Sequence, residues 1–530
     1  MQFVLSQLAA AAAYLFSSSS AQAGCPDYSS FSEQYHAPFS SGRYNLSYMR
    51  PAPACRSFNS SVVEETIARM QTVIQDPDLF RLFENSFPNS LDTAVKWRGF
   101  AANDTEQELT FLITGDIFLR KDGWTDVAGI SNAMWLRDSA NQMQSYLSVL
   151  TANSSYDSLA SLYRGVINLQ ARYINLGPHC NSFQPPVESG LSPQMNQVLP
   201  DVFTPAISNQ TAFECKWELD SLAAFLEIST NYYETTGDAA FFGKFEWVSA
   251  IETILQTTKN LLVGTYSSNG SVNTIPYTWM RETTTATETL DNLGRGNPVK
   301  DGTGLIRSAF RPSDDSTLYQ LFIPANMMFA RYLESSAKIM AAIGGYETLA
   351  NEMDSFAASI RAAITKWGIV THPTYGQIYA FEVDGFGSQN MMDDSNIPSL
   401  LSAPFFGYLN VSDPVYQSTR TFVLSEDNPY MMRGPVISAI GGPHEGFGMA
   451  WPMASTIRIF TSSDEAEILG QLQEIVSSTD GLGLIHESIN SFNQSDWTRQ
   501  WFSWANGLFG QCLLDLETRM PAVLQASFQS

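Results

Sequence analysis

Hydrophobic residues recur at spacings of three and four along most of the chain, a pattern typical of helices with one buried face. The clearest stripes run over residues 159–173, 219–226, 349–364 and 468–475. Ser462 and Glu465 predict a capping box before the last of them. Pro324 is placed for the first turn of a further helix. We assign these stripes to the core and expect no chemistry from them.

Alternating patterns typical of strands are few, and residues 108–114 and 377–383 are the best candidates. Residues 24–60, rich in Ser, Pro, Tyr and Asn, predict an irregular N-terminal arm. Beyond residue 60 no linker-like tract or change of composition divides the chain, so we expect one large domain over residues 61–530. Many amphipathic helices with long loops between them predict an all-α fold, which a toroid of paired helices accommodates.

The composition supports a large core and limits the class of partner. Of the 530 residues, 44% are hydrophobic and 15% are charged, which is not a disordered composition. The net charge of −24 argues against nucleic acid and anionic membranes, because both require a basic face. Beyond the N-terminus no apolar run approaches the ~20 residues of a membrane helix.

The N-terminus predicts a secretion signal. Residues 3–16 form a short apolar run, and Ala21-Gln22-Ala23 fits the small-x-small cleavage pattern, so we expect residues 1–23 to be removed. Eight Asn-x-Ser/Thr sequons agree with a secretory origin. They begin at Asn45, Asn59, Asn103, Asn153, Asn209, Asn269, Asn410 and Asn493. We therefore expect a secreted, N-glycosylated protein; residence in a secretory organelle stays open.

The five cysteines fit an oxidising compartment. Pairing by proximity suggests the disulfides Cys25–Cys55 and Cys180–Cys215, and it leaves Cys512, on an apolar segment, as a buried thiol. Sequence alone does not determine this connectivity. Because no CxxC occurs, a zinc ribbon or a dithiol redox role is disfavoured.

A loop that combines an aromatic residue, Arg or a carboxylate, and a following helix recurs along the chain. Such loops begin at Trp135, Trp217, Trp279, Phe310, Gly442, His486 and Trp501. Aromatic faces cover the apolar side of a sugar ring, while Arg, Asp, Glu, Asn and His hold its hydroxyl groups. A place in the core is the more frequent role for any single Trp. The recurrence nevertheless favours a carbohydrate site at one mouth of a toroid.

Cleavage of a glycosidic bond needs two carboxyl groups, one to protonate the leaving oxygen and one to activate water or attack directly. Asp314, Asp315 and Glu487 fit these roles by their chemistry.

Metal-dependent chemistry is disfavoured. The His-Glu pairs at His444 and His486 lack the second His of the HExxH zinc motif. Asp393 and Asp394 are weak evidence for calcium, because substrate contact or helix capping explains adjacent aspartates equally well. We expect no metal and no cofactor.

Several motifs, in this order along the chain, resemble those of glycoside hydrolase family 125. Within that family the resemblance is strongest to the fungal secreted members. The motifs are MWLRDSANQ (134–142), WMRETTTATETLDN with SAFRPSDD, MMDDSNIPSLL (391–401), GPHEGFGMAWPM (442–453) and LIHESIN with WFSWANGLFG. The resemblance implies an (α/α)6 barrel and metal-independent exo-hydrolysis of a terminal α-1,6-linked mannose with inversion. One departure is a long segment before Trp135, which includes Phe118 to Ser131.

By motif, the resemblance implies Asp314 as the general acid, with Asp315 as the alternative, and Glu487 as the general base. It also implies substrate contacts from Arg137, Asp138, Trp279, Arg281, Arg311 and His486, to which the aromatic pattern adds Trp135 and Trp504. An acid must be protonated at the working pH, so we expect surroundings that raise its pKa. Inversion requires carboxyl groups ~6.5–9.5 Å apart.

The expected partner is an oligosaccharide or glycoprotein with terminal α-1,6-mannose, bound by a monomer. Two alternatives stay open: another inverting helix-toroid glycosidase, such as a glucosidase or trehalase-like hydrolase, and an inactive mannose-binding lectin. The natural glycan, N-glycan trimmings or fungal wall mannan, also stays open.

Overall fold

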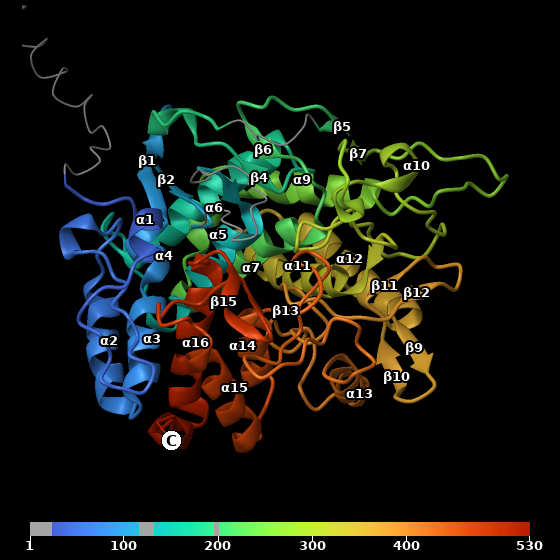
Figure 1. Ribbon diagram of the computed structural model, residues 1–530. Helices are drawn as coiled ribbons and strands as arrows, with labels where there is room; N and C mark the ends of the chain where they lie inside the picture. The colour runs from blue at the N-terminus through green and yellow to red at the C-terminus, as the bar shows by residue number, and fades with distance from the viewer. Residues whose placement is uncertain (1–23, 116–131, 195–200, 530) are drawn as a thin grey trace, which may run out of the picture.

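A computed structural model describes residues 24–115, 132–194 and 201–529 (Figure 1). The expected signal segment at residues 1–23 and the long segment from Phe118 to Ser131 lie outside the described residues. Among the described residues, no helix combines the length and the hydropathy that a membrane crossing requires.

The helices form a ring of inner and outer members that alternate along the chain. The inner helices are α5 (Leu136–Gln144), α7 (Leu219–Thr236), α11 (Ile323–Ile343), α14 (Pro452–Phe460) and α16 (Ser503–Arg519). The outer helices are α3 (Pro77–Ser86), α6 (Leu159–Leu176), α9 (Trp247–Asn260), α12 (Glu347–Trp367), α13 (Pro414–Val423) and α15 (Glu465–Ser477). Consecutive turns over residues 401–407 take the remaining inner position. The predicted (α/α)6 barrel is confirmed, with one inner helix replaced by turns.

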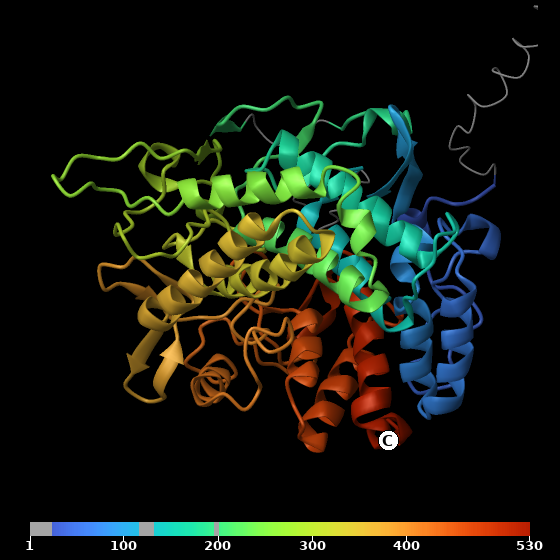
Figure 2. The same ribbon diagram turned by 180° about the vertical axis from the view of Figure 1, so that it is seen from behind.

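The ring closes where the last helix meets the first ones. Helix α16 packs against α3 and α5, and α5 packs in turn against α7. In both views the C-terminal helices, drawn in red, lie beside the N-terminal helices, drawn in blue (Figures 1 and 2). The other α-helices of the described residues are α2 (Ser61–Val73) and four helices of four or five residues, α1 (Tyr28–Ser32), α4 (Asn89–Thr93), α8 (Ala239–Phe242) and α10 (Asp291–Gly294).

The apolar stripes read from the sequence account for the helices. The four stripes fall within α6, α7, α12 and α15, and Pro324 lies in the first turn of α11, as predicted. The predicted capping box is wrong, because Asp464 caps α15 by accepting hydrogen bonds from the backbone N–H groups of Ala466 and Glu467. Ser462 donates to Glu467 instead. The competing Asp stands one residue before the helix, where its side chain reaches two unpaired N–H groups.

The strands are short, and most of them brace the starts of inner helices. Three-stranded sheets join β3 (Met134–Trp135), β4 (Ser182–Phe183) and β6 (Ala212–Glu214); β8 (Leu321–Phe322), β11 (Glu382–Val383) and β12 (Gln389–Asn390); and β13 (Met449–Ala450), β14 (Ser488–Asn490) and β15 (Asn493–Thr498). Two-stranded sheets pair β1 (Val95–Ala101) with β2 (Asp104–Leu112), β5 (Val202–Thr204) with β7 (Thr278–Met280), and β9 (Ile369–His372) with β10 (Gly376–Tyr379). The predicted strand at 108–114 falls on β2 and is confirmed. The region 377–383 is extended as predicted, but it divides into β10 and β11, which belong to different sheets.

The disulfides have the pairing expected from proximity. Cys25 is bonded to Cys55 and Cys180 to Cys215, while Cys512 is a buried free thiol. The first bond links two positions within the N-terminal arm. The second joins the residue before Asn181, ahead of β4, to the residue that follows β6. One hydrophobic cluster extends from Leu46 to Phe528, so helices from both ends of the chain share a core.

Candidate active site

The polar side chains gather at the N-terminal ends of the inner helices. Each of the six inner positions is preceded by, or begins with, a residue of one contact network. These residues are Arg137 at α5, Glu218 at α7, Asp314 and Asp315 before α11, Asp394 before the turns, His444 before α14 and Glu487 before α16. Helix N-termini carry partial positive charge, which helps to retain so many carboxylates in one place.

Arg137 lies at the centre of a buried acidic cluster. Its Nη1 is 2.6 Å from Glu218 Oε2 and 3.1 Å from Asp220 Oδ2. Its Nη2 is 3.4 Å from Asp138 Oδ2 and 3.7 Å from Asp314 Oδ1. Four carboxyl groups around one guanidinium leave excess negative charge, so the cluster favours retention of a proton.

Asn181 connects two of these carboxyl groups directly. Its Nδ2 donates to Glu218 Oε1 at 3.2 Å and to Asp314 Oδ1 at 3.1 Å. Glu218 and Asp314 are also hydrogen-bonded to each other. Because two carboxylates cannot donate a hydrogen bond, this contact requires one proton between the two groups.

The two carboxyl groups of this pair differ in their neighbours and in their exposure. Complete burial, together with the neighbouring charges of Asp314 and Asp220, raises the pKa of Glu218 well above its usual range. Burial also acts to raise the pKa of Asp314, but Arg137, the hydrogen bond from Glu218, Lys216 and His444 outweigh it and hold that pKa well below its usual range. The Asp314 side chain is 25% exposed and that of Glu218 is 0% exposed, so ionisation costs less desolvation at Asp314. A raised pKa was expected at Asp314, and that expectation is wrong.

The backbone distinguishes Asp314 from its neighbour. Asp314 has a φ of +66°, a conformation that residues other than Gly seldom adopt. A tight turn holds it there, because Arg311 N–H donates to the Asp315 carbonyl and Asp314 N–H donates to the Arg311 carbonyl. The turn directs the two adjacent carboxylates to different partners. Asp314 joins the Arg137 cluster, whereas Asp315 is 2% exposed and faces His444.

His444 links the acidic turn to Glu487. Its Nδ1 lies 3.5 Å from Asp315 Oδ1, and its Nε2 lies 3.8 Å from Glu445 Oε1. One ligand atom each from His444, Glu445 and Glu487 lie within 4.8 Å of one another. Burial acts to lower the pKa of His444. The carboxylates of Asp315, Glu445 and Glu487 have the larger effect and raise this pKa to about 10. The imidazole is therefore a cation between carboxylates.

Glu487 is held by the strands that precede α16. Its Oε2 accepts a hydrogen bond from the Thr498 hydroxyl at 3.0 Å and lies 3.3 Å from Arg499 Nε. Its backbone N–H donates to the Thr498 carbonyl across the β14–β15 pair. Arg499 itself has a φ of +50°, so it has a left-handed backbone like Asp314.

Two of the other predicted substrate ligands are arginines already paired with carboxylates. Arg281 binds Asp201 through two hydrogen bonds and Glu214 through a third. Arg311 donates from Nε to Glu382 Oε1 at 2.7 Å. Each of these ion pairs joins strands or loops of the site to one another, and the predicted contact with substrate stays a prediction.

The predicted aromatic contacts differ in exposure. Trp135 is partly exposed and packs against Phe213. The side chains of Trp279 and Trp504 are at most 1% exposed. His486 is fully buried and stacked on Trp497. Burial lowers the pKa of His486 to about 4, so this ring is neutral. These three side chains present no surface to a ligand here, and their predicted role in substrate binding stays a prediction.

Four members of the network were not assigned from the sequence: Asn181, Glu218, Asp220 and His444. Glu218 and Asp220 belong to a recurrent Trp/carboxylate loop, and His444 belongs to a motif of the resemblance, so both signals were present. Asn181 has no sequence signal beyond its place beside Cys180. Asp393 accepts hydrogen bonds from the backbone N–H groups of Leu400 and Leu401.

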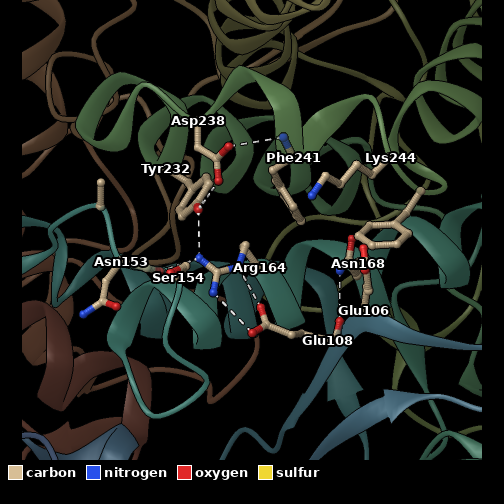
Figure 3. A pocket seen from close by; sticks show the side chains of 12 residues that line it. Glu106, Glu108, Asn153, Ser154, Arg164, Asn168, Tyr232, Asp238, Phe241 and Lys244 are labelled. Atoms are coloured by element: carbon tan, nitrogen blue, oxygen red, sulfur yellow. Dashed lines mark hydrogen bonds and ion pairs between the residues drawn. The ribbon is translucent and has the colours of Figure 1, made fainter.

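A cavity lies towards the other end of the α6–α7 pair. It has a volume of about 480 Å³ (Figure 3). Its lining comes from β2, from the segment before α6, from the N-terminal half of α6, and from the last turns of α7 with the segment that follows. Arg164 crosses it and donates to Glu108, to the Asn153 carbonyl and to Tyr232 (Figure 3). Asn181 follows the C-terminal end of α6 and Glu218 precedes the N-terminal end of α7, at the opposite ends of these two helices from Arg164 and Tyr232. The cavity is therefore separate from the carboxylate network.

A ring of paired helices with carboxylates at one mouth defines an (α/α)6 hydrolase of glycosidic bonds. Residues 76–514 match the family of metal-independent alpha-mannosidases, GH125. The chain is 43% identical over 503 residues to the meiotically up-regulated gene 157 protein of Schizosaccharomyces pombe, with 94% of each chain covered. The chain therefore belongs to glycoside hydrolase family 125.

A solved structure agrees with this assignment. It is a metal-independent alpha mannosidase of Streptococcus pneumoniae in a non-productive complex with α-1,6-mannobiose. The TM-score is 0.72 at 30% identity, and the match covers 87% of this chain and 100% of the other.

Proposed function

We propose that the protein is an inverting exo-mannosidase that releases terminal α-1,6-linked mannose, with Asp314 as general acid and Glu487 as general base. The observation that carries this proposal is the position of the two groups. Asp314 is the solvent-exposed member of the Arg137 cluster, and Glu487 lies beyond Asp315 and His444 in the same network. Membership of an alpha-mannosidase family supports the proposal, as does the relative crystallised with α-1,6-mannobiose.

In this mechanism the site performs a single displacement. Glu487 takes a proton from a water molecule, whose oxygen attacks the anomeric carbon as the bond from that carbon to the leaving oxygen breaks. Asp314 gives its proton to the leaving oxygen. Thr498 and Arg499 hold Oε2 of Glu487, which fixes the orientation of the carboxylate.

Proton NMR of the first product tests this proposal. With α-1,6-mannobiose we expect β-mannose to appear before mutarotation, and we expect no turnover of maltose or trehalose. Initial formation of α-mannose would exclude inversion. Hydrolysis of maltose or trehalose in place of mannobiose would assign the chain to another specificity. Binding of mannose without release would assign it to the lectins.

We also propose that the protein is secreted and glycosylated. The asparagines of all eight sequons are exposed, as enzymatic glycosylation requires. N-terminal sequencing of protein from the culture medium should start at Gly24, and treatment with an N-glycosidase should lower its mass. Protein found only inside the cell with residues 1–23 attached would contradict this.

A further inference from the structure

The proposed acid does not hold the proton it must give away. Asp314 is the more exposed carboxyl of its pair with Glu218 and lies 3.7 Å from the Arg137 guanidinium, so the ionised form is favoured at Asp314 and the protonated form at the fully buried Glu218. The glycosidic oxygen is only an acceptor of hydrogen bonds, so it cannot approach an ionised carboxylate favourably. A proton must therefore reach Asp314 when substrate arrives. Glu218, hydrogen-bonded to Asp314 and wholly buried, is in direct contact with it.

We propose, on the basis of the mannosidase function above, that Glu218 stores the catalytic proton and passes it to Asp314 when the substrate binds. Asn181 holds the two carboxyl groups together through one amide nitrogen. Arg137 contacts both, at 2.6 Å from Glu218 and 3.7 Å from Asp314. Glu218 is a positioning residue in this scheme, since it acts on the substrate only through Asp314.

The proton balance is complete. At rest Glu218 is a carboxylic acid and Asp314 a carboxylate. The proton moves from Glu218 to Asp314, and Asp314 then gives it to the leaving oxygen, which receives the electron pair of the broken bond. The water proton goes to Glu487 and from there to solvent. One proton from solvent restores Glu218, so each cycle consumes only the glycoside and one water molecule.

The surroundings of Glu218 allow it to exist in both forms. When it is ionised, Arg137 Nη1 and the Ser221 hydroxyl donate to its Oε2. When it is protonated, it relieves the repulsion from Asp314 and Asp220. Lys216 also faces both Glu218 and Asp314. The cation Arg137 favours the ionised form of Glu218, whereas burial and the neighbouring carboxylates favour the protonated form. Because these effects oppose each other, Glu218 can hold or release a proton at small cost.

Glu218→Gln tests the proposal. The glutamine side chain keeps the shape and the contacts with Arg137 and Asn181, but it has no proton to transfer. We expect kcat on α-1,6-mannobiose to fall by about 10²–10⁴-fold, the usual worth of general acid catalysis. The leaving group of α-mannosyl fluoride needs no protonation. On this substrate the loss of kcat should therefore be at least tenfold smaller than on α-1,6-mannobiose, because only the disaccharide depends on general acid catalysis.

The matched control is Glu227→Gln. Glu227 lies on the same helix α7, is fully buried and has a pKa raised by burial to about 7, but its carboxylate accepts from Tyr332 and not from a site residue. We expect this variant to keep the wild-type ratio of activities on the two substrates. Glu218→Gln with equal losses on both substrates would show a merely structural role and would overturn the proposal.

A measurement on protein that retains Glu218 covers the case in which Glu218→Gln does not fold. Glutamate carboxyl carbons are labelled with ¹³C in Glu227→Gln, which removes the other glutamate of markedly raised pKa. A protonated glutamate signal at pH 7 is expected, and ionisation of all glutamates would overturn the proposal. If wild-type protein hydrolyses neither substrate, the mannosidase function itself fails, whatever the labelled carboxyls show.

Discussion

The imidazole of His444 lies against the carboxylate of Asp315, with Nδ1 and Oδ1 3.5 Å apart. The pKa of His444 near 10 keeps this ring charged at every pH at which the protein is expected to work. The cation compensates Asp315, which is almost fully buried, and lies within reach of Glu487. His444 therefore joins the loop before α11 to the segment before α16.

Replacing His444 with Gln should lower both stability and activity. Because the folded pKa is raised above the ordinary value of ~6.5, the charged ring stabilises the fold fully below pH ~6.5, and this contribution is lost as pH rises through about 10. We expect a loss of about 3 kcal/mol at pH 6 that shrinks towards pH 10. Denaturant titrations at pH 6, 8 and 10 measure it, with His372→Gln as the control. A loss that is constant with pH would contradict the prediction.

Substitutions of the three catalytic candidates should separate their roles. Asp314→Asn and Glu487→Gln should each lower kcat on α-1,6-mannobiose by several orders of magnitude and leave the fold intact, because each removes one half of the acid/base pair. Circular dichroism and initial rates provide the measurement. Normal activity in Asp314→Asn together with loss in Asp315→Asn would transfer the acid role to Asp315.

Removal of the two disulfides should have different consequences for activity. The bonds close loops of similar length, with sequence separations of 30 and 35, so each should contribute about 4 kcal/mol. Cys180 and Cys215 adjoin Asn181 and Lys216, which are hydrogen-bonded to each other beside Asp314. Serine replacement of this pair should therefore also lower kcat. Replacement of Cys25 and Cys55 should lower the melting temperature and leave kcat near the wild-type value.

Asp393 should make the protein less stable as pH rises. Burial is the main cause that raises its pKa to about 8. The folded state thus binds one more proton than the unfolded state between pH ~4 and about 8, and stability falls across this window by up to about 1.4 kcal/mol per pH unit. Asp393→Asn should flatten the dependence measured by denaturant unfolding from pH 5 to 8. The exposed Asp427→Asn is the control, and an unchanged slope in Asp393→Asn would refute the explanation.

The sequence determined the helices and the class of chemistry. Stripes at helical spacing mark α6, α7, α12 and α15, because burial of one face follows from local periodicity. The capping of α15 was predicted wrongly, since Asp464 and Ser462 both suit a cap and only local geometry selects between them. The motifs around Asp314 and Glu487 suggested a pair of carboxyl groups, because those residue types perform that chemistry.

Only the tertiary structure decided how these groups act on one another. The adjacent carboxylates of Asp314 and Asp315 are equivalent in sequence, and a turn with positive φ sends them to different partners. Glu218, Asn181 and Arg137 come from three separate segments and meet at Asp314 because α5, α7 and α11 pack side by side. The pKa of each group follows from its burial and its neighbours, which are properties of the folded ring. The site of the catalytic proton is therefore decided by the fold.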